Sequence, residues 1–258
     1  MMIPLPIKKI QVDYLPVSIY ADNLAMGRAS ALDAREQIVK AISERGESSI
    51  ILATGNSQLT FLHTLKELNG IDWTKVRIFH MDEYLGLAST HPASFPLFLK
   101  EHFIQHINPS AFYPVPNSPD NIERACRDYE QLLRDYPADL VAMGWGENGH
   151  IAFNDPPDAL FNDQQWVKVV ELAEVSRRQQ VGEGHFGSLS DVPTHAITLT
   201  IPALLAPKRI LCIVPEARKA EAVRSCLNEP VSEEHPGSIL RTLKHASLYL
   251  DLESSANL

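Results

Sequence analysis

The sequence predicts an α/β protein of three layers, in which a doubly wound, mostly parallel sheet has helices on both faces. Short apolar runs of strand length alternate with longer amphipathic segments almost to the end of the 258 residues. Such alternation is typical of parallel strands whose connections are helices. Polar, often glycine-containing loops follow several of the apolar runs, and open sheets of this class bind ligands outside the carboxyl ends of their strands.

The first half of the chain predicts helices and buried strands in turn. Apolar residues lie on one face of the segment 22–45, which indicates a helix that ends at Gly46. These apolar residues are Ala31, Ala34, Ile38 and Ile42. Residues 49–53 are apolar and rich in isoleucine, so we expect a buried strand there. The same patterns predict helices at 58–68 and 92–106 and a strand at 76–80.

The second half continues this order. A helix is expected at 118–136, with Ile122, Cys126, Tyr129 and Leu133 on its inner face. Strands are expected at 140–143, 166–172, 196–199, 209–214 and 247–250, and a helix at 216–227. The sequence contains no internal repeat, low-complexity tract or linker, so we expect a single domain over residues 1–258.

The composition, with 45% hydrophobic and 21% charged residues, indicates a soluble globular protein. We expect no membrane partner and no secretion, because no apolar run approaches the roughly 20 residues that span a bilayer and the first residues lack a signal pattern. Three cysteines without metal-site or redox spacing favour buried thiols in a reducing cytoplasm. The net charge of -9 disfavours a nucleic-acid partner, since phosphate backbones bind basic faces. The number of subunits stays open, a homo-oligomer included.

The most informative stretch is the loop 144–156, which follows the apolar run 140–143. It combines three glycines with His150 and the carboxylates Glu147 and Asp155. Glycines allow a sharp turn and a close approach to a ligand, and a histidine between carboxylates can exchange protons near neutral pH. A glycine-rich turn with a solvated histidine is the alternative, but the rest of the chain favours a site.

The loop Thr54-Gly55-Asn56-Ser57 follows the predicted strand 49–53. Gly55 permits a tight turn, after which backbone N–H groups and the Ser57 hydroxyl can hold an anion at the positive end of a helix. A plain turn with a capping Ser or Asn is the alternative on this evidence alone.

Two further strand ends carry charged residues. Asp82 and Glu83 follow the strand 76–80, and strand geometry sends them to opposite sides, so at most one should face a ligand. A capping acid with a salt-bridged neighbour is the alternative. Lys219 stands early in a helix, where its charge opposes the helix dipole. Either phosphate binding or exposure to solvent explains it.

Two of these segments carry a family resemblance. Residues 81–87, Met-Asp-Glu-Tyr-Leu-Gly-Leu, resemble the Met-Asp-Glu-Tyr signature of the glucosamine-6-phosphate deaminase/isomerase family, whose fold is shared with 6-phosphogluconolactonases. Residues 149–154, Gly-His-Ile-Ala-Phe-Asn, are similar to the family's Gly-His-Ile-Ala-Phe-Asn-Glu-Pro block. The likeness continues through residues 192–193, 219–220 and 243–245, so it covers nearly the whole chain.

The resemblance implies an aldose–ketose isomerisation with loss of ammonia, which converts glucosamine 6-phosphate to fructose 6-phosphate without a cofactor or a metal ion. It implies that Asp82 moves the proton between C2 and C1 and that His150 opens the sugar ring. It also implies that Asn148 and Asp155 orient and tune His150. The substrate- and phosphate-binding residues expected from it are Thr54, Gly55, Asn56, Ser57, Lys219 and Arg178.

The sequence departs from the family's pattern at three places. Asn148 stands where the family usually has aspartate, and an amide cannot stabilise an imidazolium as a charge does, so Asn148→Asp is expected to raise turnover. Asp155 stands where the family has the longer glutamate, which puts its reach to His150 in question. The polar segment 174–192 takes the place of the family's lid, and we expect it to close over the substrate. Arg177 and Arg178 are the candidates for the lid's phosphate-binding arginine.

Three other functions stay open. Galactosamine 6-phosphate is an alternative substrate for which a neutral residue at 148 is less surprising. Hydrolysis of 6-phosphogluconolactone needs no carbon-acid base, so the Asp82 motif favours the deaminase. A non-catalytic sugar-phosphate sensor is the third, although this acidic chain has no room before residue 49 for a DNA-binding helix-turn-helix.

Overall fold

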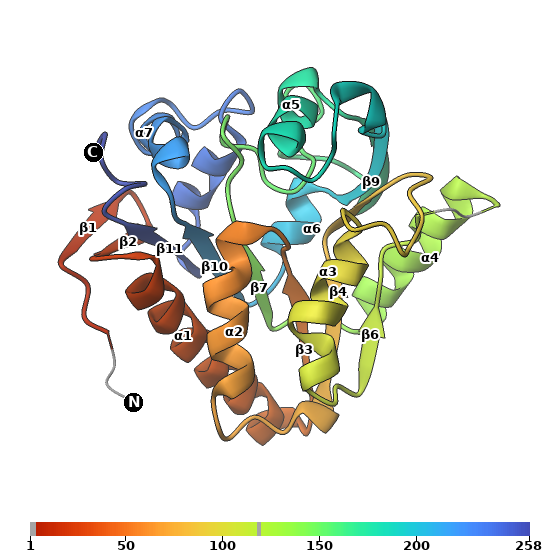
Figure 1. Cartoon of the computed structure of the whole chain (residues 1–258). Coiled ribbons are helices and arrows are strands. Elements are labelled where there is room, and N and C mark those ends of the chain that lie inside the picture. The colour runs from red at the N-terminus through yellow and green to blue at the C-terminus, as the bar shows by residue number, and fades with distance from the viewer. Residues whose placement is uncertain (1–3, 118–119) are drawn as a thin grey trace.

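An eight-stranded sheet forms the centre of the molecule (Figure 1). The structure is a computed structural model, and it describes residues 4–117 and 120–258. The strands of the sheet are β1 (Lys8–Val12), β2 (Leu15–Tyr20), β3 (Ser48–Leu52), β4 (Val76–His80), β6 (Ala111–Tyr113), β7 (Leu140–Met143), β10 (Arg209–Val214) and β11 (Ala246–Asp251). Their order is β1-β2-β11-β10-β7-β3-β4-β6, and every neighbouring pair is parallel except β1 with β2.

Helices cover both faces of this sheet, as the sequence predicts. One face carries α1 (Asn23–Arg45), α2 (Leu59–Glu67) and α3 (Phe95–His102), which lie in front of the strands in Figure 1. The other face carries α4 (Ile122–Asp135), α6 (Ile201–Leu205) and α7 (Ala220–Asn228). None of the helices in the described part of the chain is long and apolar enough to cross a membrane. The predicted three-layer, mostly parallel α/β fold is confirmed.

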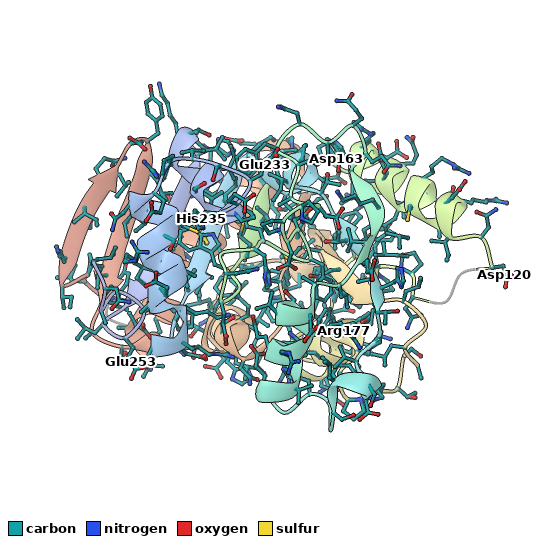
Figure 2. All side chains as sticks on the ribbon, turned by 90° about the horizontal axis from the view of Figure 1, so that it is seen from above. Asp120, Asp163, Arg177, Glu233, His235 and Glu253 are labelled. Carbon is teal, nitrogen blue, oxygen red and sulfur yellow. The ribbon has the colours of Figure 1, made fainter. Side chains whose placement is uncertain are left out.

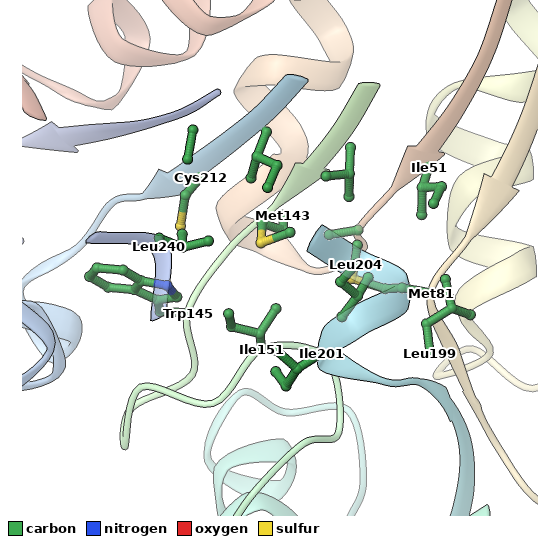
Figure 3. Packing of buried hydrophobic residues seen from close by; sticks show 14 of the residues in the cluster. Ile51, Met81, Met143, Trp145, Ile151, Leu199, Ile201, Leu204, Cys212 and Leu240 are labelled. Carbon is green, nitrogen blue, oxygen red and sulfur yellow. The ribbon is translucent and has the colours of Figure 1, made fainter. Parts of the chain in front are cut away.

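The two faces of the sheet bury separate apolar clusters. Because successive strand side chains point to opposite faces, Ile50 of β3 packs with α1, α2 and α3, while Ile51 packs with α4, α6 and α7. Figure 3 shows part of the second cluster, in which Cys212 of β10 lies beside Leu240. Each fully buried aliphatic side chain contributes about 1.5–3 kcal/mol, so this packing holds the strand ends in fixed positions.

The predicted elements are largely confirmed, with small shifts at their ends. The Asp22 side chain accepts a hydrogen bond from the Ala25 N–H at 2.7 Å, and Gly46, at a φ of 82°, ends α1. The predicted helix 92–106 divides into α3 and a 3₁₀ turn at Ile104–His106. The predicted helix 216–227 begins as a 3₁₀ turn at Ala217–Lys219 before α7. Residues 118 and 119 of the predicted helix 118–136 lie outside the described residues.

A second, small sheet is the main difference from the expected pattern. It contains β5 (Asp82–Tyr84), β8 (Val167–Glu171) and β9 (His195–Leu199), and both of its strand pairs are antiparallel. Strands were expected at 166–172 and 196–199, and they form here as β8 and β9. The polar segment between them forms α5 (Glu174–Gly182) and a 3₁₀ turn (Leu189–Asp191). The predicted lid 174–192 therefore contains an ordered helix.

The central sheet changes direction between β3 and β7. These two strands are neighbours, yet the chain continues from β3 towards β4 and β6 on one side and from β7 towards β10 and β11 on the other. The loops that follow β3 and β7 therefore run in opposite directions and leave a crevice at the carboxyl ends of the two strands. Ligands bind in such crevices in open α/β sheets. The loops 53–58 and 144–156 both begin at this point.

Candidate active site

A cleft of about 860 Å³, its open mouth included, lies at this switch point. Loops that follow β3, β4, β7 and β10 line it, and α5 covers it from above (Figure 1). Of the residues predicted for the site, those that line the cleft are Thr54, Gly55, Asn56, Ser57, Asp82, His150 and Lys219.

The loop after β3 turns at Gly55, whose φ of 94° is open to glycine but strained for other residues. A 3₁₀ turn, Asn56–Gln58, then leads into α2. Its first backbone bond joins the Gln58 N–H to the Gly55 carbonyl at 3.0 Å, which leaves the N–H groups of Asn56 and Ser57 available to a ligand. Buried Gln58 supports the loop, because its amide nitrogen lies 3.3 Å from both the Ser57 hydroxyl and the Ile213 carbonyl.

Asp82 and Glu83 lie on opposite sides of β5, as strand geometry predicts. Asp82 lines the cleft but is only 7% exposed, and burial together with the charge of Glu83 raises its pKa to about 8. Glu83 is fully buried and accepts hydrogen bonds from the Ser94 hydroxyl and the Tyr84 N–H, both at 2.8 Å. One carboxyl group therefore faces the ligand space, and the other ties β5 to the start of α3.

His150 is held by polar groups on one edge of its ring. Its Nδ1 lies 2.7 Å from the Asn148 amide oxygen and 3.1 Å from Asp155 Oδ1. Two acceptors at this edge assign the ring proton to Nδ1. Among the described residues, no hydrogen bond involves Nε2, which leaves this nitrogen as a proton acceptor for a ligand. The ring lies against Gly146, where an added Cβ would come within 2.0 Å of it.

The doubt about the reach of Asp155 is resolved by this geometry. The shorter carboxylate contacts His150 directly, and the Asn148 amide nitrogen donates to the same Oδ1 at 2.7 Å. Burial opposes ionisation of Asp155, but the charge and hydrogen bond of His150 and the bonds from Asn148 and Ser176 lower its pKa overall. Asn148 therefore links the imidazole to the carboxylate, and neither Asn148 nor Asp155 is among the residues that line the cleft.

Two cationic side chains, Lys219 and Arg218, also line the cleft, and the part that they line is called its cationic end. Lys219 is only 4% exposed, and burial, followed by the charge of Arg218, lowers its pKa. Within the described part of the chain, no hydrogen bond or ion pair satisfies its ammonium group. Arg218 also lines the cleft and pairs with Glu183 of the lid at 2.5 Å. Burial alone raises the pKa of Glu183, but bonds from His185 and Gln179 and the cationic charges lower it to about 2.

The lid does not bring its predicted arginine to the cleft. Arg178 is exposed on α5 and pairs with Glu174, four residues earlier on the same helix. Arg177 donates instead to the backbone carbonyls of Leu189 at 2.7 Å and Val192 at 2.9 Å. Figure 2 looks down on this side of the molecule and labels Arg177 on α5. The assignment of Arg178 to phosphate is therefore not supported, because its charge is paired outside the cleft.

Sequence patterns missed several residues of the cleft. Glu183, His185 and Gln179 of the lid line it, and so does Arg218. The Arg-Lys pair at 218–219 was a visible signal, whereas the lid residues depend on how α5 folds back. Across residues 4–117 and 120–258, no group of three or more His, Cys, Asp or Glu side chains could hold a metal ion. A carboxyl of raised pKa, an imidazole held at its Nδ1 edge and a cationic end together suit proton transfer on an anionic ligand.

Comparisons with curated proteins agree with this chemistry. The sequence model of the family described as Glucosamine-6-phosphate isomerases/6-phosphogluconolactonase matches residues 21–249. A glucosamine-6-phosphate deaminase of Geobacillus sp. (strain WCH70) is 34% identical over 230 residues, which cover 86% of this chain and 88% of the relative. Glucosamine-6-phosphate deaminase 1 of Bacillus subtilis (strain 168) is 34% identical over 224 residues, which cover 83% and 89%.

Solved structures give the same result for the fold. A monomeric glucosamine-6-phosphate deaminase superposes with a TM-score of 0.86 at 29% identity, covering 94% of this chain and 99% of that one. A 6-phosphogluconolactonase from Shewanella baltica OS155 has a TM-score of 0.75 at 20% identity, covering 94% and 97%, a likeness of fold alone. With a family match that spans most of its length, this chain belongs to the glucosamine-6-phosphate isomerase/6-phosphogluconolactonase family of enzymes.

Proposed function

We propose that this enzyme converts glucosamine 6-phosphate and water to fructose 6-phosphate and ammonia. The observation that carries the proposal is one cleft that combines the Asp82 carboxyl, the imidazole of His150 and the ammonium of Lys219. A lactone hydrolysis needs no base for a carbon acid, whereas an isomerisation does. The deaminase names of relatives at 34% identity support the same reaction.

Ring opening is the role proposed for His150. The free Nε2 accepts the proton of the sugar's C1 hydroxyl, the bond between C1 and the ring oxygen breaks, and the ring oxygen receives a proton from the imidazole. Histidine suits both steps, since it accepts and donates protons near neutral pH. Asp155 and Asn148 keep the ring proton on Nδ1 and so keep Nε2 free for the sugar.

Proton transfer between carbons is the role proposed for Asp82. The open-chain aldehyde makes the C2 hydrogen acidic, and the Asp82 carboxylate removes it while the C1 carbonyl oxygen takes up a proton from the substrate's ammonium group. The Asp82 carboxyl then delivers its proton to C1 of this enolamine. The resulting iminium at C2 adds water and releases ammonia, which leaves the ketone. A buried carboxylate is a stronger base than one in water, and the raised pKa of Asp82, about 8, fits this step.

Phosphate binding is the role proposed for the cationic end of the cleft. Lys219 is only 4% exposed, and among the described residues its ammonium has no ion pair or hydrogen bond, so an anionic ligand best explains its position. Arg218 and the N–H groups of Asn56 and Ser57 supply further donors to a phosphate at the start of the 3₁₀ turn that leads into α2. Binding remote from the reacting carbons fixes their position.

The substrate is tested by measuring ammonia and ketose phosphate release from glucosamine 6-phosphate and galactosamine 6-phosphate, with 6-phosphogluconolactone hydrolysis measured in parallel. We expect a higher kcat/KM for glucosamine 6-phosphate than for its C4 epimer, and no lactone hydrolysis above background. A preference for the epimer would reassign the sugar. Hydrolysis of the lactone without ammonia release from either amino sugar would replace the proposed reaction.

The pH dependence of the reaction follows from the Asp82 carboxyl. The base must be ionised, and its pKa in the folded enzyme is about 8. We therefore expect kcat/KM to rise as the pH increases through that value, measured by ammonia release from about pH 6 to about pH 9. A kcat/KM that stays constant over this range would show that a group of different pKa acts as the base.

The hydrogen bonds of Asn148 reverse the outcome expected for Asn148→Asp. The amide nitrogen donates to Asp155 at 2.7 Å, so an aspartate would set two carboxylates against each other beside His150. The added negative charge favours the imidazolium, and a protonated ring cannot accept the C1 hydroxyl proton. We expect turnover near neutral pH to fall about tenfold, with the acidic limb of kcat displaced to higher pH.

The matched control for this variant is Asn162→Asp, which adds the same charge at an exposed position. Its kcat and pH profile should equal those of the wild type. Faster turnover by Asn148→Asp at neutral pH would restore the expectation drawn from the sequence and contradict the role given to the amide.

A further inference from the structure

In α5, the helix of the lid, Ser176 is the one buried residue. Its hydroxyl contacts Asp155, the carboxylate that holds His150. Ser176 is 4% exposed, while its neighbour Val175 is 52% exposed. The Ser176 hydroxyl lies 2.8 Å from Asp155 Oδ1 and 2.9 Å from Asp155 Oδ2. It also lies 3.4 Å from His150 Nδ1. A segment more than 20 residues along the chain from His150 thus reaches the edge of the ring that carries its proton.

Among the described residues, the Ser176 hydroxyl is the one group that donates a hydrogen bond to Asp155 Oδ2. Asp155 Oδ1 accepts from the Asn148 amide and contacts His150, whereas the hydrogen bond to Oδ2 comes from Ser176. A carboxylate accepts but does not donate, so the Ser176 proton points to Asp155. This bond fixes the rotation of the carboxylate and withdraws part of its charge from the imidazole.

Other contacts hold Ser176 in this position. Its neighbour Arg177 ties α5 to the backbone at Leu189 and Val192. One turn further along, the Gln179 side-chain oxygen accepts a hydrogen bond from the Glu147 N–H at 3.3 Å. The hydroxyl therefore meets Asp155 because α5 is docked on the loop that follows β7.

We infer that Ser176 is a positioning residue of the lid. Its hydroxyl orients Asp155 against His150, so that His150 is set for ring opening only when α5 is docked. The inference rests on the proposed function. It joins the two parts of the site, because a substrate that keeps the lid in place also keeps Asp155 in its productive orientation.

Several charged groups besides Asp155 lie in the same cleft as His150 and contribute to any measured pH profile. Asp82, Lys219, Arg218, Glu183 and His185 line the same cleft. Replacing Ser176 leaves all of these side chains unchanged, so a change in the titration of His150 reports on Asp155. Without the hydroxyl, the full charge of the carboxylate acts on the ring and favours the imidazolium.

The test compares Ser176→Ala and Ser176→Thr with the exposed lid control Ser190→Ala. For Ser176→Ala we expect kcat on glucosamine 6-phosphate to fall about tenfold with KM unchanged within about twofold, and the acidic limb of kcat to move to higher pH. Ser176→Thr keeps the hydroxyl and should restore both quantities. An unchanged kcat and pH profile in Ser176→Ala, or a loss that Ser176→Thr does not restore, would overturn the inference.

A second measurement does not depend on turnover. The imidazole of His150 is titrated by NMR in protein labelled at histidine, with its signal assigned from a His150→Gln variant. The midpoint should move to higher pH in Ser176→Ala and stay at the wild-type value in Ser190→Ala. An unmoved midpoint contradicts the inference even if the enzyme proves inactive on glucosamine 6-phosphate. Wild-type inactivity would contradict the proposed function instead.

Discussion

Asp82→Asn is expected to lower kcat on glucosamine 6-phosphate by about a thousandfold or more while leaving the substrate bound. Asparagine has nearly the same shape but cannot accept the C2 proton. Because Lys219 and the loop 54–57, and not Asp82, are proposed to hold the phosphate, binding energy is retained. Turnover is measured as ammonia release, and binding is measured separately by calorimetry under the same conditions.

The same substitution should raise the thermal stability. The pKa of Asp82 is about 8 in the folded protein and about 4 in an unfolded chain. The unfolded state therefore releases this proton at lower pH, and ionisation of Asp82 lowers the free energy of unfolding as the pH rises between these values. Asp82→Asn removes that cost, and we expect a gain of about 1 kcal/mol at neutral pH, as is common when a strained site residue is neutralised.

The control for Asp82→Asn is Asp128→Asn, at an exposed position of α4 where the side chain pairs with Arg124 at 3.4 Å. This variant should keep both kcat and the melting temperature of the wild type. Undiminished ammonia release by Asp82→Asn would remove Asp82 from the mechanism. A lower melting temperature would show that its carboxylate stabilises the fold.

Lys219→Met is expected to raise KM for glucosamine 6-phosphate by about 10- to 100-fold, because a charge-assisted bond to phosphate contributes about 1.5–3 kcal/mol. Methionine keeps most of the apolar stem, which packs in a position only 4% exposed. Burial and the charge of Arg218 lower the pKa of Lys219, so the ammonium is held at a cost to stability. Removing it should also raise the melting temperature.

The effect of Lys219→Met is measured against Lys40→Met, at an exposed position of α1. Inorganic phosphate serves as a second probe: it should stabilise the wild type against heat and lose this effect in Lys219→Met. An unchanged KM together with intact protection by phosphate would show that the phosphate is bound elsewhere in the cleft.

The elements that local periodicity controls were predictable from the sequence. The strand at 140–143 and the helix at 22–45 are confirmed, because their apolar spacing matches the face that they bury. The hairpin of β1 and β2 was missed: β1 is largely exposed at the edge of the sheet, whereas Leu15, Val17 and Ile19 of β2 alternate as in a half-buried strand and were overlooked. The antiparallel sheet of β5, β8 and β9 depends on partners distant in sequence, which periodicity does not reveal.

The residues of the site also divide into those that the sequence indicates and those that only the fold brings together. Loops at the ends of strands carry their own signal, so Asp82 and His150 were found from residue type and position, and both line the cleft. Ser176 and Glu183 carry no such signal, because their contacts with Asp155 and Arg218 exist only once α5 folds over the sheet. Arg178 was expected from the resemblance to a family whose lid carries a phosphate-binding arginine, but Glu174 on the same helix pairs with it.

The most direct test of the proton transfer by Asp82 follows deuterium placed at C2 of glucosamine 6-phosphate. The products of the wild type and of Asp82→Asn are analysed by NMR. We expect the wild type to move the label from C2 to C1 of fructose 6-phosphate or to water, and Asp82→Asn to leave it at C2 of unreacted substrate. Loss of the label from C2 with ammonia release at equal rates in Asp82→Asn and the wild type would contradict the account.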